Sequence, residues 1–366
     1  MIKRGTISPR QVFFILIMLL TGIYILILPR HLVTIVGTDG WLVLLVGGFV
    51  SSLMLFFINK ISRKFPGKTV VEFAPVVMGL FLGKLLGGIL VVYYTFLAAV
   101  SLRIFAEMLK SVLLSDTPRW VVVVALVALI TWIVQNGLED IARFTELLAP
   151  IILLLLIAAF LGDVRYMEAI RLRPMFQSAA LPLLEGFLSS LSYFGIIIVL
   201  LMLYPYVNAP KKLTITSLLA LAFAVLITIG FFIGAVATFG IYETGRMAWP
   251  VIELVKMVRV GEFLERVESL FLSVWLSIAF INVSVLAFCS VSGWTQLINA
   301  ENYRKLTYPI MLSLLLLSLW PRDLLDVLGL YSLNFTYGFL ITLIIPFFIF
   351  VVSQFHKGEK NDVSNP

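Results

Sequence analysis

The chain has 366 residues, of which 61% are hydrophobic and only 13% are charged, and its formal net charge is +7. Soluble domains carry roughly a quarter charged residues, so this composition excludes a soluble globular domain and predicts a polytopic membrane protein. The apolar stretches are continuous and as long as membrane helices, which excludes a β-barrel built of alternating strands. Most lysines and arginines lie between these stretches, so the positive charge indicates membrane topology and lipid contact, with no nucleic-acid partner.

Ten stretches are apolar and long enough to cross a bilayer, which takes about 20 residues per helix. They lie near 9–35, 41–59, 83–113, 119–135, 138–161, 182–207, 213–241, 267–293, 306–320 and 330–354. An even number of spans places both termini on the same side. Basic residues crowd the N-terminus and the connection after the second span, which predicts that this side is cytoplasmic.

The first and sixth stretches are interrupted. The first runs apolar from Val12, meets Thr21 and Gly22, and resumes before Pro29. The sixth contains a small and polar run, 189–195, ahead of a second apolar run. Broken helices at corresponding places in two halves are typical of transporters with five-plus-five inverted repeats, the LeuT-like fold. We therefore expect one all-α membrane domain over 1–366, with repeats at about 9–161 and 182–354 and a disordered cytoplasmic tail at 355–366.

The break in the first span predicts a binding site, because glycine lets the backbone leave helical geometry and lets a ligand approach closely. Amides freed at a helix start suit a carboxylate. The alternative is that the glycine only packs against another helix. The matching break favours binding, and helices one, three, six and eight line the site in transporters of this fold. The candidate ligand-binding residues are Thr21, Gly22, Ile23, Tyr94, Ser189, Ser192, Tyr193, Gly195, Asn282 and Ser284.

Two groups of charged side chains inside the spans are candidates for ion pairs. Arg103 and Glu107 lie one turn apart in the outer half of the third span and can pair, more simply as a structural ion pair than as a functional one. Glu139, Arg143 and Glu146 share one face at the cytoplasmic end of the fifth span. They are expected to clamp an inner gate or to fix loop packing.

The sequence contains few residues of the kinds that commonly act in catalysis or bind metals. Cys289 is the only cysteine, and His31 and His356 are the only histidines. A single cysteine excludes an intrachain disulfide and a multi-cysteine metal site. The histidines are too distant in sequence to suggest a shared site. We expect no enzyme activity, no metal and no cofactor.

A short amphipathic helix is predicted over 249–258, with proline in its first turn. It lies on the outer side before the eighth span. It is either an external lid or partner-docking surface, or an interfacial helix that rests on lipid.

Several short motifs, in this order and spacing, resemble the spore germination permease family over essentially the whole chain. They are Ile7-Ser8-Pro9-Arg10-Gln11, Phe65-Pro66-Gly67-Lys68-Thr69, Asn136-Gly137-Leu138-Glu139-Asp140-Ile141-Ala142-Arg143, Leu203-Tyr204-Pro205-Tyr206, Trp249-Pro250, the run from Gly261 to Phe271, and Trp275. The chain looks like the B subunit of a nutrient germinant receptor, a relative of the amino acid–polyamine–organocation transporters. The resemblance implies a small nutrient ligand, an A subunit, a C-subunit lipoprotein and the spore inner membrane. It places the ligand at the unwound centre of helices one and six.

Two functions remain open at this point. A receptor subunit binds a small nutrient, for which an amino acid is the expected class, and passes a conformational signal to partners. An amino acid/cation symporter of the same superfamily needs a coupling group, yet the first and eighth spans carry no charge near their centres. That absence favours the receptor, although sodium held by carbonyls and by hydroxyls such as Ser284 would also serve coupling.

Overall fold

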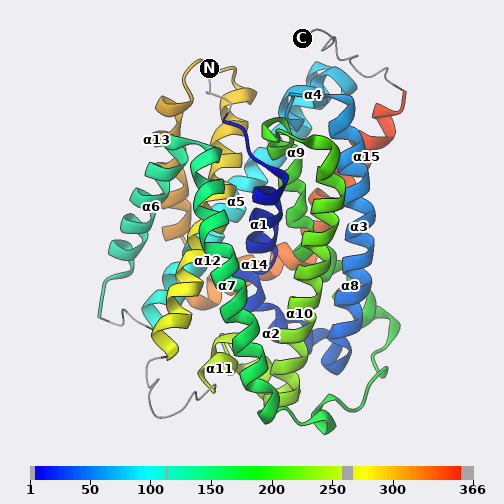
Figure 1. The fold of residues 1–366 in the computed structure, drawn as a ribbon, viewed down its shortest axis with the longest axis vertical. Helices are drawn as coiled ribbons and strands as arrows, with labels where there is room; N and C mark the ends of the chain where they lie inside the picture. The colour runs from blue at the N-terminus through cyan, green and yellow to red at the C-terminus, as the bar shows by residue number, and fades with distance from the viewer. Residues whose placement is uncertain (1–4, 113, 115, 258–266, 356–366) are drawn as a thin grey trace.

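The computed structural model describes residues 5–112, 114, 116–257 and 267–355, which form one bundle of helices (Figure 1). Its helices are α1 (Pro9–Leu20), η1 (Ile23–Leu26), α2 (Leu28–Val36), η2 (Gly37–Asp39), α3 (Gly40–Lys64), α4 (Val70–Met78), α5 (Leu80–Val112), α6 (Arg119–Asn136), α7 (Leu138–Asp163), η3 (Val164–Tyr166), η4 (Ala169–Leu172), α8 (Ala180–Phe194), η5 (Gly195–Val199), α9 (Leu200–Leu203), η6 (Tyr204–Tyr206), α10 (Pro210–Arg246), α11 (Pro250–Lys256), α12 (Val267–Leu297), α13 (Tyr303–Leu319), α14 (Leu324–Phe339), η7 (Leu340–Ile344) and α15 (Ile345–Ser353).

Every predicted span corresponds to a helix or an interrupted helix. Among the described residues, nine helical stretches are long and apolar enough to cross a membrane. The tenth span is α13, whose 17 residues reach about 25 Å at 1.5 Å per residue. Two features were not predicted: the separate helix α4, and the π-helical turn η7 that interrupts the last span. The fold is therefore the predicted ten-helix membrane bundle.

Helix α1 occupies the centre of the bundle (Figure 1). It packs against α7, α10 and α12, and the side chains from Ile15 to Leu20 are at most 1% exposed. The first turn is set by a capping box in which Ser8 and Gln11 satisfy each other's backbone amides. A helix that is apolar on every side belongs in a bundle interior, and α1 is one.

The sixth span leaves α-helical geometry later than predicted. The expected break at 189–195 is wrong in its position, because α8 continues to Phe194 and the irregular part runs from Gly195 through η5. The serines of this run stay inside the helix because their hydroxyls bond carbonyls one turn back, Ser190 to Phe187 at 2.7 Å and Ser192 to Leu188 at 3.1 Å.

The two broken spans run in opposite directions and are joined at three depths. Before α1, Ile7 pairs with the end of the sixth span through its amide to Tyr206 O at 2.8 Å. At the centre, the Tyr193 hydroxyl donates to the Leu20 carbonyl. Beyond the break, the His31 ring lies 3.2 Å from the Ser189 hydroxyl. These contacts make the two interrupted helices one structural unit.

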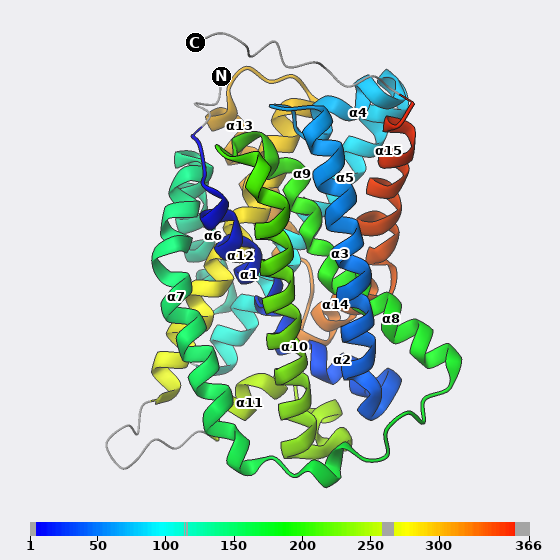
Figure 2. The same cartoon turned by 45° about the vertical axis from the view of Figure 1, so that its right-hand side comes forward.

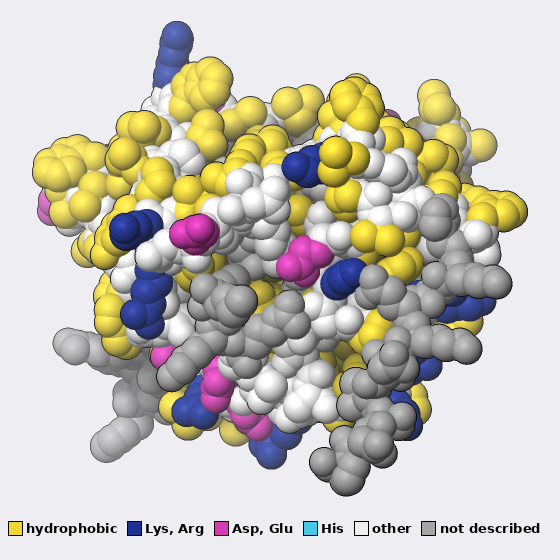
Figure 3. Space-filling view, turned by 90° about the horizontal axis from the view of Figure 1, so that it is seen from above, with side chains coloured by type: hydrophobic (Ala, Val, Ile, Leu, Met, Phe, Trp, Pro, Cys, Tyr) yellow, Lys and Arg dark blue, Asp and Glu magenta, His cyan; other side chains and the backbone are white. Residues whose placement is uncertain are grey.

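Helix α1 begins and α15 ends at the same end of the bundle, called here the terminal end (Figures 1 and 2). The other end, where α2, α11 and the connection after α7 lie, is called the distal end. Viewed onto the terminal end, Lys and Arg side chains lie both at the edges and nearer the centre, among hydrophobic side chains and several Asp and Glu side chains (Figure 3). The predicted tail falls mainly on 356–366, outside the described residues.

Candidate functional site

The break in the first span is a short non-helical step followed by the 3₁₀ turn η1. Thr21 ends α1, and its hydroxyl donates to Ile17 O at 2.7 Å. Gly22 follows with φ −72° and ψ −147°, and η1 starts at Ile23. A Cβ on Gly22 would lie 2.5 Å from Asn282 Nδ2 and 2.8 Å from Met18 O. Position 22 therefore requires glycine because the Asn282 side chain and the Met18 carbonyl come too close for a Cβ atom. The backbone φ of −72° would by itself allow other residues.

Two of the predicted residues reach the carbonyls next to the break. Tyr193 donates to Leu20 O, and Asn282 Nδ2 donates to Leu19 O at 3.3 Å. Both side chains are buried. Carbonyls freed inside a membrane protein need such donors, because no lipid group can supply them. The structure thus brings Thr21, Gly22, Tyr193 and Asn282 together around one interruption.

The irregular part of the sixth span is held by a different pair of contacts. Tyr94 on α5 donates to Ile198 O of η5 at 3.1 Å. Gly195 packs against η7, and a Cβ there would come within 2.2 Å of Thr342 Oγ1. The predicted residues Tyr94 and Gly195 therefore lie at the second interruption.

Ile23 begins η1 directly after Gly22, and its side chain lies outside the described ones; the other predicted residues do not meet at the first break. Ser189 contacts His31, and Ser192 accepts a bond of 2.8 Å from the Phe339 amide of α14. Ser284 is fully buried on α12, with no hydrogen-bond partner for its hydroxyl among the described residues. The Asn282 Oδ1 atom likewise lacks a donor there. Of these two unsatisfied oxygens, only Asn282 Oδ1 belongs to a side chain that reaches the first break.

A stack of aromatic rings lies distal to the break and was not predicted. The ring of Tyr24 in η1 stacks on Tyr331 at 4.9 Å, Tyr331 meets Phe335 edge-on at 4.5 Å, and Phe335 stacks on His31 at 4.4 Å. The Tyr24 hydroxyl also bonds Ser101 at 2.7 Å. These four rings form the aromatic barrier between the break and the distal end. Only Tyr24, inside the interrupted stretch, could have been suspected from sequence.

Helix α11 lies at the distal end against the bundle (Figures 1 and 2). Val251, Ile252, Leu254 and Val255 are at most 4% exposed and face α2, α7, α10, α12 and η1. The predicted short helix exists over Pro250–Lys256, but its apolar side is covered by protein and does not rest on lipid.

The three charged residues predicted to share one face of the fifth span lie at the terminal end but do not all pair with one another. Arg143 pairs with Glu139 one turn before it, as its spacing predicts. Glu146 instead pairs with Arg10 in the first turn of α1 at 3.2 Å. Since the Arg10 side chain is 71% exposed, this pair contributes little to stability and serves to position α1 beside α7.

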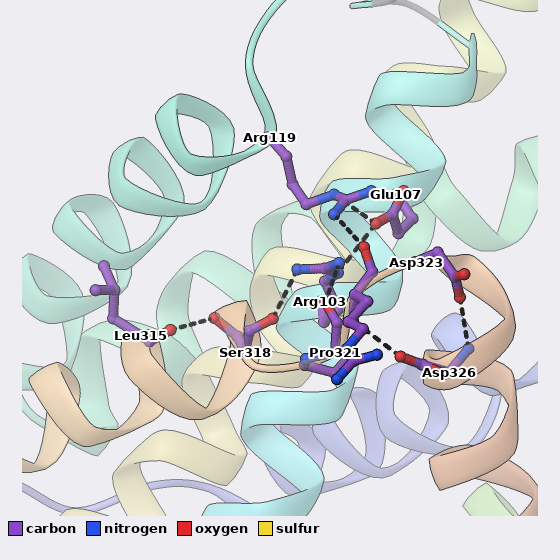
Figure 4. A network of polar contacts seen from close by, with 9 residues as sticks. Arg103, Glu107, Arg119, Leu315, Ser318, Pro321, Asp323 and Asp326 are labelled. Carbon is purple, nitrogen blue, oxygen red and sulfur yellow. Dashed lines mark hydrogen bonds and ion pairs between the residues drawn. The ribbon is translucent and has the colours of Figure 1, made fainter.

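Arg103 and Glu107 form a buried network at the distal end and not a simple interfacial pair. Glu107 lies between two guanidinium groups, 3.0 Å from Arg103 and 2.7 Å from Arg119 (Figure 4). Arg103 also donates to Ser318 O at 3.0 Å and to Pro321 O at 2.7 Å. The side chain of Arg103 is 1% exposed. The network ties α5 and α6 to the connection between α13 and α14.

A large groove lies away from the break. It has a volume of about 1110 Å³ between α5, α13 and α14, and its lining, which includes Val92, Phe96 and Leu330, contains none of the residues at the first break. The break itself is closed by its own hydrogen bonds in this conformation.

We expect Tyr193→Phe to lower the free energy of unfolding by about 1–3 kcal/mol, because the buried Leu20 carbonyl would lose its donor. Equilibrium unfolding in mixed micelles measures this change. Tyr242→Phe is the control, since Tyr242 is 83% exposed and should leave stability unchanged. Equal stability of the two variants would show that Tyr193 does not support the break.

Solved transporter structures share this fold. A nucleobase-cation-symport-1 family transporter, Mhp1, in a closed conformation with bromovinylhydantoin bound, matches with a TM-score of 0.71 and 13% identity. The match covers 93% of this chain and 78% of that one. MhsT in complex with L-phenylalanine matches with a TM-score of 0.75 and 15% identity, over 95% and 89% of the two chains. The protein is therefore a multi-pass membrane protein with the LeuT-like transporter fold.

Sequence similarity assigns the chain to a specific family within this fold. The profile of the family described as "Spore germination protein" matches residues 6–327, and the chain belongs to that family. Spore germination protein KB of Bacillus subtilis (strain 168) is 26% identical over 98% of this chain and 97% of its own length. Spore germination protein YndE of the same strain is 25% identical, covering 97% and 98%. Spore germination protein B2, also from that strain, is 26% identical over 92% of each chain.

Proposed function

We propose that this protein is the membrane subunit of a spore germinant receptor that binds a small nutrient at the first break. The main support for this proposal is the interruption of the first span at Gly22. The carbonyls just before it accept hydrogen bonds from Tyr193 and Asn282, which come from two other helices. Membership of the spore germination family supports a role in germination, and the LeuT-like fold supports a small-ligand site at the centre of helices one and six.

The hydrogen bonds at the break suggest how a ligand would act. A carboxylate-bearing nutrient that accepts bonds from amides of the unwound segment would compete with the present closed arrangement. Tyr193 and Asn282 would then change partners and move α8 and α12 relative to α1. A ligand shifts such an equilibrium only by binding one arrangement more tightly. We therefore propose an amino acid as the chemical class of the nutrient.

The signal requires partners to receive it. We propose an A subunit and a C-subunit lipoprotein as those partners, the spore inner membrane as the location, and a cytoplasmic terminal end. Basic residues at that end, among them Lys60, Arg63, Lys64, Lys211 and Lys212, support this orientation.

Deleting the gene in its sporulating host tests the function. We expect spores that no longer germinate in response to at least one nutrient, while uptake of labelled amino acids by vegetative cells is unchanged. The measurement is the fall in optical density of spore suspensions across single nutrients, with a complemented strain as control. Normal germination to every nutrient, combined with lost uptake, would overturn the receptor proposal.

An amino acid/cation symporter is the second candidate. It is favoured by the unsatisfied buried oxygen Asn282 Oδ1, whose side chain reaches the break and could contact a cation. It is disfavoured by the sequence, which has no charged residue from Gln11 to Pro29 or from Leu270 to Gln296. Accumulation of a labelled amino acid that depends on a Na⁺ or H⁺ gradient in proteoliposomes would support the symporter.

A further inference from the structure

A pocket of about 320 Å³ lies on the distal side of the aromatic barrier, between α2 and α14. Its polar lining comes from Arg30, His31, Thr34 and Ser332, and its apolar lining includes Ile27 and Phe335. The volume is at the lower end of the range for small-molecule sites. No carboxylate lines this pocket, so its side chains give it a positive character.

Arg30 is the residue that points to a ligand. Within the described parts of the chain it has no ion pair, hydrogen bond or ring partner, although it is only partly exposed. It is the third residue of α2. The positive end of the helix dipole disfavours a cation in the first turn, and nothing else among the described residues offsets it. An anion in the pocket would give the Arg30 guanidinium a partner and would offset its unfavourable interaction with the helix dipole.

The aromatic lining narrows the class of anion. Phe335 presents its ring beside His31, and Tyr331 supports it from the barrier. A planar carboxylate can make two parallel hydrogen bonds to a guanidinium group, while its apolar part lies against these rings and Ile27. Phosphate would leave the apolar half of the pocket without a matching surface.

We propose that this distal pocket is a second binding site, separate from the break, for small carboxylates with an apolar body. Arg30 binds the carboxylate, and Phe335 with Ile27 covers the apolar part. The aromatic barrier separates this site from Gly22, so occupancy of one site does not require occupancy of the other. Where the proposed nutrient is itself a carboxylate, the pocket lies on its path from the distal side.

The test uses the purified full-length protein in lipid nanodiscs, with benzoate as the probe and uncharged benzamide as its isostere. Phenylglyoxal modifies accessible arginines, and mass spectrometry of the Arg30 peptide reports the rate at that residue. We expect saturating benzoate to slow Arg30 modification at least about tenfold, and benzamide to have no effect. Arg143 is the internal control, because its side chain is 68% exposed and it lies at the terminal end, away from the pocket.

Equilibrium binding of radiolabelled benzoate supplies the second readout. Arg30→Gln should weaken binding at least about tenfold, whereas Arg143→Gln, at the terminal end of the bundle, should bind as the unchanged protein does. Equal protection by benzamide, or unchanged binding to Arg30→Gln, would overturn the proposal. Loss of binding in Gly22→Ala alone would place the carboxylate at the break, which would support the proposed function and refute the second site.

Discussion

Replacing Arg103 by alanine should lower the free energy of unfolding by about 3–5 kcal/mol, the largest stability effect expected for a single substitution in this protein. The guanidinium is buried and joins Glu107 to the carbonyls of Ser318 and Pro321 (Figure 4). Without it, the two carbonyls lose their donors, and Glu107 keeps only Arg119. Equilibrium unfolding in mixed micelles, together with the amount of protein in the membrane fraction, measures the loss.

Arg143→Ala is the matched control for this prediction. Arg143 also pairs with a glutamate one turn away, but its side chain is 68% exposed. Exposed pairs of this kind contribute at most about 1 kcal/mol. Arg103→Lys should fall between the two, because it keeps the charge but not the planar fork that reaches three acceptors. Similar stability of the Arg103→Ala and Arg143→Ala proteins would contradict the importance given to the buried network.

Gly22→Ala should abolish the response to the nutrient, or raise the nutrient concentration needed by at least about tenfold. The added methyl group meets Asn282 Nδ2 and the Met18 carbonyl at distances that real Cβ atoms do not adopt, so the break must rearrange. Overpacking of this kind costs about 1–3 kcal/mol. Germination of spores carrying the variant, at protein levels matched by immunoblot, is the measurement.

Gly88→Ala provides the control for Gly22→Ala. Gly88 lies within α5, and a Cβ there would meet only Leu297 at 3.6 Å, an ordinary contact. Alanine in a helix interior is more favourable than glycine by roughly 0.5–1 kcal/mol, so this variant should germinate normally. Normal nutrient sensitivity in Gly22→Ala spores would remove the break from the proposed ligand site.

Much of the fold was predictable because a membrane helix needs a continuous apolar run, and such runs are visible along the chain. The interruption at Thr21–Gly22 was placed correctly because glycine directly follows a polar residue within an apolar stretch. The sixth span was placed less well. The serine-rich run predicts a break, whereas the serine hydroxyls bond carbonyls of the preceding turn and α8 continues to Phe194.

Some ion pairs were also predictable from sequence, and others were not. The spacing of Glu139 and Arg143 predicts their pairing, because four residues is about one helical turn. Nothing local predicts that Glu146 meets Arg10, or that Glu107 is shared with Arg119 from the next helix. These partners are distant in sequence and are chosen by helix packing.

The amino-acid sequence by itself determined the membrane class, the ten spans, the central break and the family, because each depends on local composition, spacing or ordered motifs. Only the tertiary structure decided what surrounds that break. Tyr193, Asn282 and the aromatic barrier are assembled from helices that are remote in sequence. Their approach depends on which faces of the helices pack together, and in a uniformly apolar chain the faces are not distinguished by hydrophobic pattern.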